Sequence, residues 1–123
     1  MYLKLAHTKL DVFQYSRALT LEYYRRTKTF PPEERYALTS QIRRAVLSVH
    51  LNIAEGCSRK SLPERKRFFE VSRGSVIEVD TAFDIAIALE YCSEAELNVL
   101  SEHLIRVFKI LSSLIGQEAP THH

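Results

Sequence analysis

Residues 97–114 read LNVLSEHLIRVFKILSSL and carry the clearest helical pattern in the chain. Large aliphatic side chains recur there at steps of three and four residues: Leu97, Leu100, Leu104, Val107, Leu111 and Leu114. This spacing places all of them along one side of an α-helix, as in the seam of a helical bundle. Ser93 and Glu96 form a capping box, so we expect the helix to span about residues 93–115.

Three earlier stretches have the same periodicity, and they predict helices over about residues 11–28, 32–55 and 63–90. Their expected buried stripes are Val12, Tyr15, Leu19 and Tyr23 in the first, Leu38, Ile42, Ala45, Val49 and Ile53 in the second, and Phe68, Ser72, Val76, Val79, Phe83, Ala86 and Glu90 in the third. Leu47 and Leu51 lie off the second stripe, so a second face of that helix is partly apolar.

Capping and breaking residues set the expected helix boundaries. Asp11 is placed to cap the first helix, and Pro32 to begin the second. We expect Gly56 to end the second helix, because glycine adopts the left-handed conformation at low cost. Ser61 is the expected cap of the third helix. Gly74 lies in the middle of that helix and indicates close approach of a neighbouring backbone.

Long helices joined by short connections favour antiparallel neighbours. The chain has 123 residues, enough for one core, and only 3 glycines and 4 prolines interrupt it. The sequence therefore predicts an all-α protein: an antiparallel up-down-up-down four-helix bundle that forms a single domain over residues 1–123.

Cysteine usage and hydropathy indicate the compartment. Cys57 and Cys92 are too few and too far apart for a disulfide framework, which suits free thiols in a reducing environment. No stretch approaches the roughly 20 apolar residues of a membrane span, and the N-terminus lacks the apolar run of a signal peptide. We therefore expect a cytoplasmic location.

The charges are divided unequally along the chain. Residues 1–60 hold 11 Lys and Arg against 5 Asp and Glu, whereas residues 61–123 hold 6 against 10. A basic half suits a polyanionic partner, and two halves of opposite sign also suit self-association. Ordinary solvated helix faces account for either half almost as well.

Sequence patterns typical of catalysis are missing. The chain contains no P-loop, GxGxxG, HExxH or GxSxG, and no Glu-x-x-His of the di-metal bundles. His50 and His103 are single histidines on different helices. Asp80 and Asp84 share a helix face but lack a partnering histidine, so surface acids are the favoured interpretation. We expect no metal, no other cofactor and no enzymatic activity.

Polar residues on the second and third helices form one candidate site. Arg44, Asn52 and Glu55 share a side of the second helix with Gln41 and Ser48, and Arg73, Ser75 and Glu78 are expected to meet that side near Gly74. Arg44 or Arg73 would then pair with Glu55 or Glu78. The favoured interpretation is a structural network that sets helix register, and the alternative is a ligand or RNA pocket. The predicted members are Arg44, Asn52, Glu55, Arg73 and Glu78.

A basic stretch forms the other candidate site, between the second and third helices. Its cations are Arg59, Lys60, Arg65, Lys66 and Arg67, and Phe68-Phe69 follow directly. Cations bind phosphates without reading sequence, and nearby aromatic rings stack on unpaired bases. At least one of the two phenylalanines is expected to anchor the core. A solvated basic loop remains an equal alternative to a nucleic-acid site.

Several of these segments together resemble a known bacterial family. FPPEER at 30–35, LTSQIRRA at 38–45, NIAEG at 52–56 and RGS at 73–75 are similar to the 23S rRNA intervening-sequence (S23-type) four-helix-bundle proteins. The resemblance spans about residues 10–114. It departs from the common pattern at His50, where a proline often stands, and at Cys57, where an aromatic is frequent.

The resemblance implies a four-helix bundle, a ring-like homo-oligomer with five subunits favoured, and RNA, such as rRNA, as partner. A related branch contains the accessory variability proteins of diversity-generating retroelements, basic pentameric rings that bind nucleic acid and a reverse transcriptase. The alternative function is therefore a structural or protein-interaction ring, such as a reverse-transcriptase accessory protein. The family supplies no catalytic residues.

Overall fold

A computed structural model of the chain describes Leu5 and residues 10–117, so the predicted domain, 1–123, extends beyond them at both ends. These residues form helices and no strand, which confirms the all-α fold class. The α-helices are α1 (Asp11–Thr27), α2 (Leu38–Ser58), α3 (Leu62–Ala88) and α4 (Asn98–Ile115). Short 3-10 helices precede two of them: η2 (Pro32–Glu34) and η3 (Ala95–Leu97).

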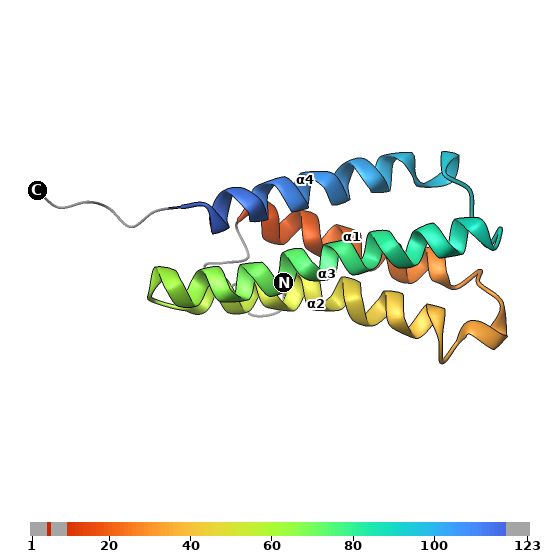
Figure 1. The fold of residues 1–123 in the computed structure, drawn as a ribbon, viewed down its shortest axis with the longest axis horizontal. Helices are drawn as coiled ribbons and strands as arrows, with labels where there is room; N and C mark the ends of the chain where they lie inside the picture. Colours follow the sequence, from red (N-terminus) through yellow and green to blue (C-terminus); the bar gives the residue numbers. More distant parts are fainter. Residues whose placement is uncertain (1–4, 6–9, 118–123) are drawn as a thin grey trace, which may run out of the picture.

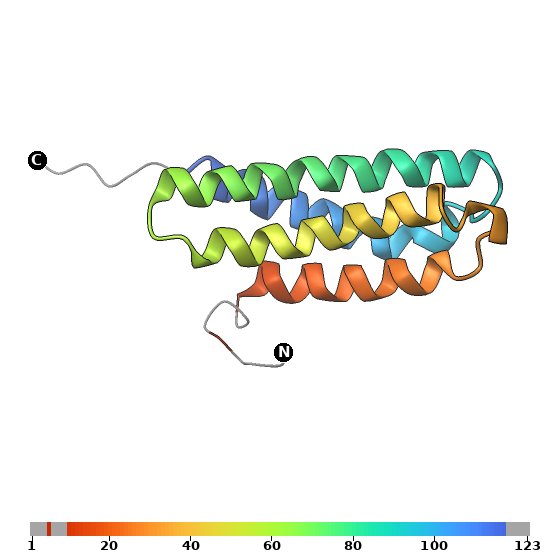
Figure 2. The same cartoon turned by 90° about the horizontal axis from the view of Figure 1, so that it is seen from below.

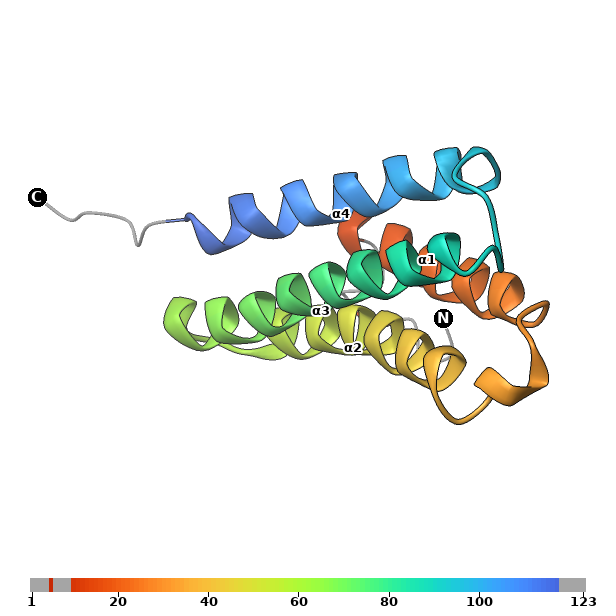
Figure 3. The same ribbon diagram turned by 45° about the vertical axis from the view of Figure 1, so that its right-hand side comes forward.

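The four helices run alternately up and down and form an antiparallel bundle (Figures 1 and 2). α2 packs on α1 and α3, and α4 packs on the other sides of α1 and α3. α2 and α4 therefore lie diagonally opposite each other, on either side of the α1 and α3 pair in Figure 3. The predicted up-down-up-down four-helix bundle is confirmed.

The core consists of the apolar stripes predicted from periodicity. Leu19 of α1, Ile42 and Ile53 of α2, Val79 of α3 and Leu111 of α4 are among the side chains buried almost completely. Each burial of this kind stabilises the fold by roughly 1.5–3 kcal/mol relative to an exposed side chain. Within the predicted stripes, the residues that are only half-buried or exposed are Tyr15, Leu38, Phe68, Glu90 and Leu114.

α2 and α3 form the most closely packed pair of helices. Small residues allow this approach. The Ser72 hydroxyl donates to the Val49 carbonyl oxygen at 2.7 Å, and the Ser75 hydroxyl donates to the Ser48 hydroxyl oxygen at 2.9 Å. Bonds of this kind satisfy buried hydroxyls that would otherwise destabilise the interface.

Neither glycine of this pair has the role that the sequence predicted. Gly56 does not end α2 in a left-handed conformation, because the helix continues to Ser58 and no described glycine has positive φ. Instead, a Cβ at Gly56 would lie 2.6 Å from the Phe69 ring, so Gly56 provides the close approach between helices. Gly74 is exposed and has no atom within 4 Å of the position that a Cβ would occupy.

Three helix starts also differ from the prediction. Pro32 opens only η2, and Ala37, with φ −119° and ψ −104°, separates it from α2, which begins at Leu38. Ser93 does accept the Glu96 N–H at 3.3 Å, but this bond lies at the turn around η3, before α4 begins at Asn98. Leu10, not Asp11, occupies the capping position of α1. The predicted cap at Ser61 is confirmed, since its hydroxyl oxygen accepts the N–H of Glu64 at 3.3 Å.

Candidate nucleic-acid interface

The five cations of the basic stretch surround the α2–α3 turn. Arg59 and Lys60 lie between the two helices, and Arg65, Lys66 and Arg67 follow in the first turns of α3. The turn lies at one end of the long axis of the bundle, beyond the start of α1 (Figures 1 and 2). The structure thus brings all five residues together at a projecting end of the molecule.

The rings of Phe68 and Phe69 lie beside two of these cations, Arg59 and Arg65. Phe69 is 2% exposed and belongs to the core, which confirms the prediction that at least one of the pair is an anchor. Phe68 is half-buried, and the Arg59 guanidinium carbon lies 4.7 Å from the centroid of its ring. Arg65 lies 6.0 Å from the Phe69 centroid. The cations, rather than a bare aromatic face, are therefore the groups presented to a partner.

The five cations of the turn outnumber the acids beside them, which are Glu55, Glu64 and Glu70. Arg59 donates to the Glu55 carboxylate at 3.0 Å, and both side chains are about half exposed (42% and 53%). An exposed pair one helical turn apart stabilises the protein by only about 0.3–0.5 kcal/mol. Lys60 and Arg67 are exposed, and Arg65 and Lys66 are half-buried.

Cys57 lies beneath this basic end at the last turn of α2. Burial raises the pKa of its thiol, and the Arg65 cation partly opposes this rise. A thiol with a raised pKa carries little of the nucleophilic thiolate at neutral pH. Cys57 is half-buried and packs against the hydrophobic core.

The predicted charged network does not form, and its members make other contacts. Glu55 pairs with Arg59 instead of Arg44 or Arg73, while Arg44 and Glu78 are exposed. Arg73 faces α4, where its Nη1 donates to the Ser112 hydroxyl oxygen at 3.2 Å. The predicted pairing is wrong because Glu55 lies on the exposed face of α2, whereas Arg73 lies on the side of α3 that contacts α4.

A neutral network replaces it between α2 and α3. Asn52 is the predicted member that takes part, and its Nδ2 donates to the carbonyl oxygen of Ser48 at 2.9 Å and to the Ser48 hydroxyl at 3.1 Å. The Ser48–Ser75 contact, expected from the sequence, completes it. Neutral groups that bond one another set the helix register without exposing a charge for ligand binding.

Two polar residues of the motif region have roles that the sequence did not reveal. Arg43 lies beside the end of α1, where its Nε donates to Thr27 Oγ1 at 2.9 Å and its Nη2 donates to the Tyr24 carbonyl at 3.2 Å. His50 Nδ1 and Ser16 Oγ are 2.6 Å apart. A local sequence pattern does not show which helix a side chain will contact, so the contacts of Arg43 and His50 with α1 could not be predicted from the sequence.

Other kinds of site are not seen in the described part of the chain. No group of three or more His, Cys, Asp or Glu residues in it is placed to hold a metal ion. None of its helices is long and apolar enough to cross a membrane.

An antiparallel four-helix bundle with a basic end is the class of protein that this geometry defines. The sequence matches the 23S rRNA-intervening sequence proteins over residues 8–113, and the chain belongs to that family. A crystal structure of a protein of unknown function from the S23 ribosomal protein family of Bacteroides thetaiotaomicron has the same fold, with a TM-score of 0.76. The two are 17% identical, and the match covers 86% of this chain and 99% of that one. No curated protein sequence matches the chain.

Proposed function

We propose that this chain is a non-enzymatic, self-assembling protein that binds structured RNA, such as rRNA, through the α2–α3 turn. One observation carries the proposal: Arg59, Lys60, Arg65, Lys66 and Arg67 gather at a projecting end and outnumber the acids beside them. Membership of a family described by 23S rRNA intervening sequences supports RNA as the polyanion.

Binding through such a surface is electrostatic. Each cation that contacts a phosphate releases condensed counterions, so affinity falls steeply as salt rises. A homo-oligomeric ring, with five subunits favoured by the family resemblance, would repeat the basic end around its axis. Modest sites would then add through avidity.

The test replaces three of the cations and leaves the core untouched. In the variant Arg65→Gln, Lys66→Gln, Arg67→Gln we expect weaker binding to structured RNA, whatever its sequence. Each lost phosphate contact lowers the slope of log affinity against log salt by roughly 0.7–0.9. Filter binding at several salt concentrations, with circular dichroism to confirm folding, measures both effects.

The matched control removes the same charge elsewhere, through Arg17→Gln, Arg35→Gln and Lys109→Gln at exposed positions. We expect the control to retain a steeper salt dependence than the α2–α3 variant. Equal losses in the two variants would mean that binding follows net charge and not this surface. Absence of wild-type binding at low salt would remove RNA as the partner.

A protein-interaction ring is the second candidate, such as a reverse-transcriptase accessory protein related to the accessory variability proteins of diversity-generating retroelements. Exposed aliphatic side chains on α2 and α3 favour it, among them Leu51 (53% exposed), Val71 (50%) and Ile85 (49%). Apolar side chains gathered on outer faces are typical of protein contacts rather than RNA contacts. Retained oligomerisation without RNA binding would support this candidate.

A further inference from the structure

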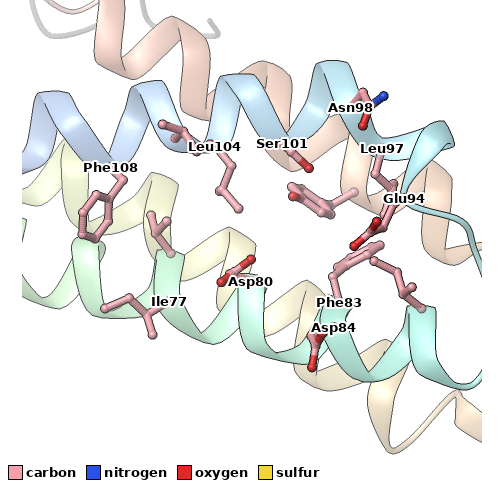
Figure 4. Close-up of a pocket in the computed structure, with 14 residues that line it drawn as sticks. Ile77, Asp80, Phe83, Asp84, Glu94, Leu97, Asn98, Ser101, Leu104 and Phe108 are labelled. Atoms are coloured by element: carbon pink, nitrogen blue, oxygen red, sulfur yellow. The ribbon is translucent and has the colours of Figure 1, made fainter.

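A groove of about 580 Å³ opens between α3 and α4, near the end of the bundle that holds the α3–α4 connection (Figure 4). Its walls carry Ile77 and Ile105, each about half exposed (54% and 53%), together with Phe108. Asn98 and Ser101 of α4 add polar groups to the lining. The groove is lined by more apolar than polar side chains and is open to solvent.

Carboxylates border this groove, and none of its lining residues is Lys or Arg. Asp80 and Asp84 of α3 and Glu94 of the α3–α4 connection all line it, and Asp80 points into the space between the two helices (Figure 4). An adjoining hollow adds Glu90 and Glu96. An apolar trough between acidic edges is complementary to a partner with apolar side chains on one face and cations beside them.

Arg26, in the last turn of α1, is a cation near the α3–α4 connection. It lies close enough to Cys92 to oppose the rise in the pKa of that thiol, which burial and Glu96 cause. Its Nε is bound to the Glu22 carboxylate at 3.1 Å. Within the described residues, Asp80, Asp84 and Glu94 take part in no ion pair, so they are available to an external cation.

Tyr23 gives the groove a buried polar group. It lines the cavity and is only 4% exposed. Its hydroxyl forms no hydrogen bond with the described residues. Every fully buried side-chain polar atom in the described part of the chain has a hydrogen-bond partner, so the Tyr23 hydroxyl must be reached by solvent in the groove. It can therefore form a hydrogen bond with a bound partner. Burial first, then Asp80 and Cys92, raise the pKa of Tyr23, so the hydroxyl stays protonated.

We propose that the α3–α4 groove binds a basic amphipathic helix of a partner protein. The partner's apolar face would contact Ile77, Ile105 and Phe108, and its Lys or Arg side chains would pair with Asp80, Asp84 and Glu94. From Val76 to Ile87 the α3 wall is about 16 Å long, which matches about three turns of helix. Nucleic acid is excluded from this surface by its charge.

The groove and the basic α2–α3 turn occupy opposite ends of α3. Arg65 and Asp84 are 19 residues apart on this helix, a distance of about 28 Å. The two surfaces can therefore be occupied together, so the chain would connect RNA with a basic protein. The groove proposal depends on neither RNA binding nor self-assembly, and the tests of those proposals can fail without affecting it.

The experiment uses a fluorescein-labelled peptide of about 14 residues with Leu on one helical face and Lys on the other. Fluorescence anisotropy with the full chain, freed of nucleic acid by nuclease, measures its affinity in ~150 mM salt. We expect Asp80→Asn, Asp84→Asn, Glu94→Gln together to weaken binding about tenfold. Tyr23→Phe should weaken it about threefold.

The control variant Glu64→Gln, Glu70→Gln, Glu102→Gln removes the same charge from exposed acids outside the groove. It should bind the peptide within about twofold of wild type, because distant exposed charges are screened at this salt. A scrambled peptide of the same composition, without an apolar face, should bind at least tenfold more weakly. Absence of wild-type binding, equal losses in both triple variants, or equal affinity for the scrambled peptide would overturn the proposal.

Discussion

Gly56 and Gly74 lie on facing helices, yet their surroundings are opposite. At Gly56 the atoms Cε1 and Cδ1 of Phe69 lie 2.6 and 2.8 Å from the position that a Cβ would occupy. Phe69 is buried and cannot swing aside into solvent. At Gly74 the same position is open space. Sequence alone shows two helical glycines and does not reveal which of them a neighbour has made necessary.

Alanine at the two positions should therefore have effects of opposite sign. Gly56→Ala should lower the free energy of unfolding by about 1–2 kcal/mol, because the clash with Phe69 exceeds the gain in helix propensity. Gly74→Ala should raise it by up to about 1 kcal/mol, since only propensity changes. Urea titrations followed by circular dichroism measure both values. Changes of the same sign would contradict the packing described.

The raised pKa of Tyr23 allows us to predict how the stability of the fold changes at alkaline pH. Burial, Asp80 and Cys92 raise its pKa in the folded protein above the ordinary value of about 10. The folded state then keeps a proton that the unfolded state releases, so this contribution to stability is complete below about pH 10 and is lost as the pH rises further.

Tyr23→Phe removes that titration and should flatten the fall in Tm between about pH 9.5 and 11.5. Tyr36→Phe is the matched control, because Tyr36 is 87% exposed. Its pH dependence should follow that of the wild type. The interpretation would be refuted by identical slopes for Tyr23→Phe and the wild type.

At the scale of the element, the end of α3 is unusual. Glu90 has φ of 64°, and the bonds from Tyr91 N–H to the Ala86 carbonyl and from Glu90 N–H to the Ile87 carbonyl, both 2.9 Å, form a Schellman motif. Glycine normally occupies that position, because other residues are strained there. The carboxylate that the chain places there instead borders the hollow next to the α3–α4 groove.

Glu90→Gly should stabilise the protein by about 0.5–1 kcal/mol, since it relieves the strain while adding some unfolded-state entropy. Glu90→Ala is the control: it removes the carboxylate but keeps the Cβ, and should give no such gain. Thermal and urea unfolding of the three proteins compare them. Equal stability of the glycine and alanine variants would mean that the backbone strain is relieved elsewhere.

Helix existence was predictable here and helix starts were less so. The seam of α4 follows from spacing alone, because leucines at steps of three and four have one helical solution. The starts of α2 and α4 were placed five or six residues too early. Pro32 and the Ser93–Glu96 box do initiate helical turns, but these are 3-10 turns that end before the α-helix begins. Local signals mark a turn without fixing which helix type continues.

The candidate sites differ in the same way. The basic cluster was predictable because its cations are neighbours in sequence and any short turn keeps them together. The charged network was not predictable, because Arg73 forms its hydrogen bond with Ser112, 39 residues away in the sequence, rather than with an acid on α2. Asp80 and Asp84 were seen to share a face, but Glu94 and Tyr23 join them only through the packing of α4 and α1.

At the scale of the whole molecule, charge is separated along α3 and not simply between the two halves of the sequence. The basic residues 65–67 begin this helix, and the acids of the α3–α4 groove lie toward its other end. One rigid helix therefore carries both surfaces. In an oligomer, each surface would be repeated in every subunit.

The outer face of α2 predicts how copies of the chain associate. Arg44, Leu47, Leu51 and Glu55 are exposed at helical spacing, with Leu47 and Leu51 37% and 53% exposed. Two aliphatic side chains between opposite charges suit a contact with another copy of the chain, and in a cyclic ring this face would meet a different face of the neighbouring subunit. Light scattering in ~150 mM salt should give a multiple of 14.2 kDa for the wild type.

Leu47→Gln with Leu51→Gln should shift the mass toward 14.2 kDa while the helical content and the core remain unchanged. The control pair, Leu21→Gln with Val99→Gln, changes exposed aliphatic residues on α1 and α4 (41% and 66% exposed) and should keep the wild-type mass. The neutral replacements leave net charge constant, so a shift reports the lost apolar contact rather than electrostatic repulsion. A monomeric wild type would exclude the ring, whereas dissociation by the control pair alone would move the interface from α2 to the opposite side of the bundle.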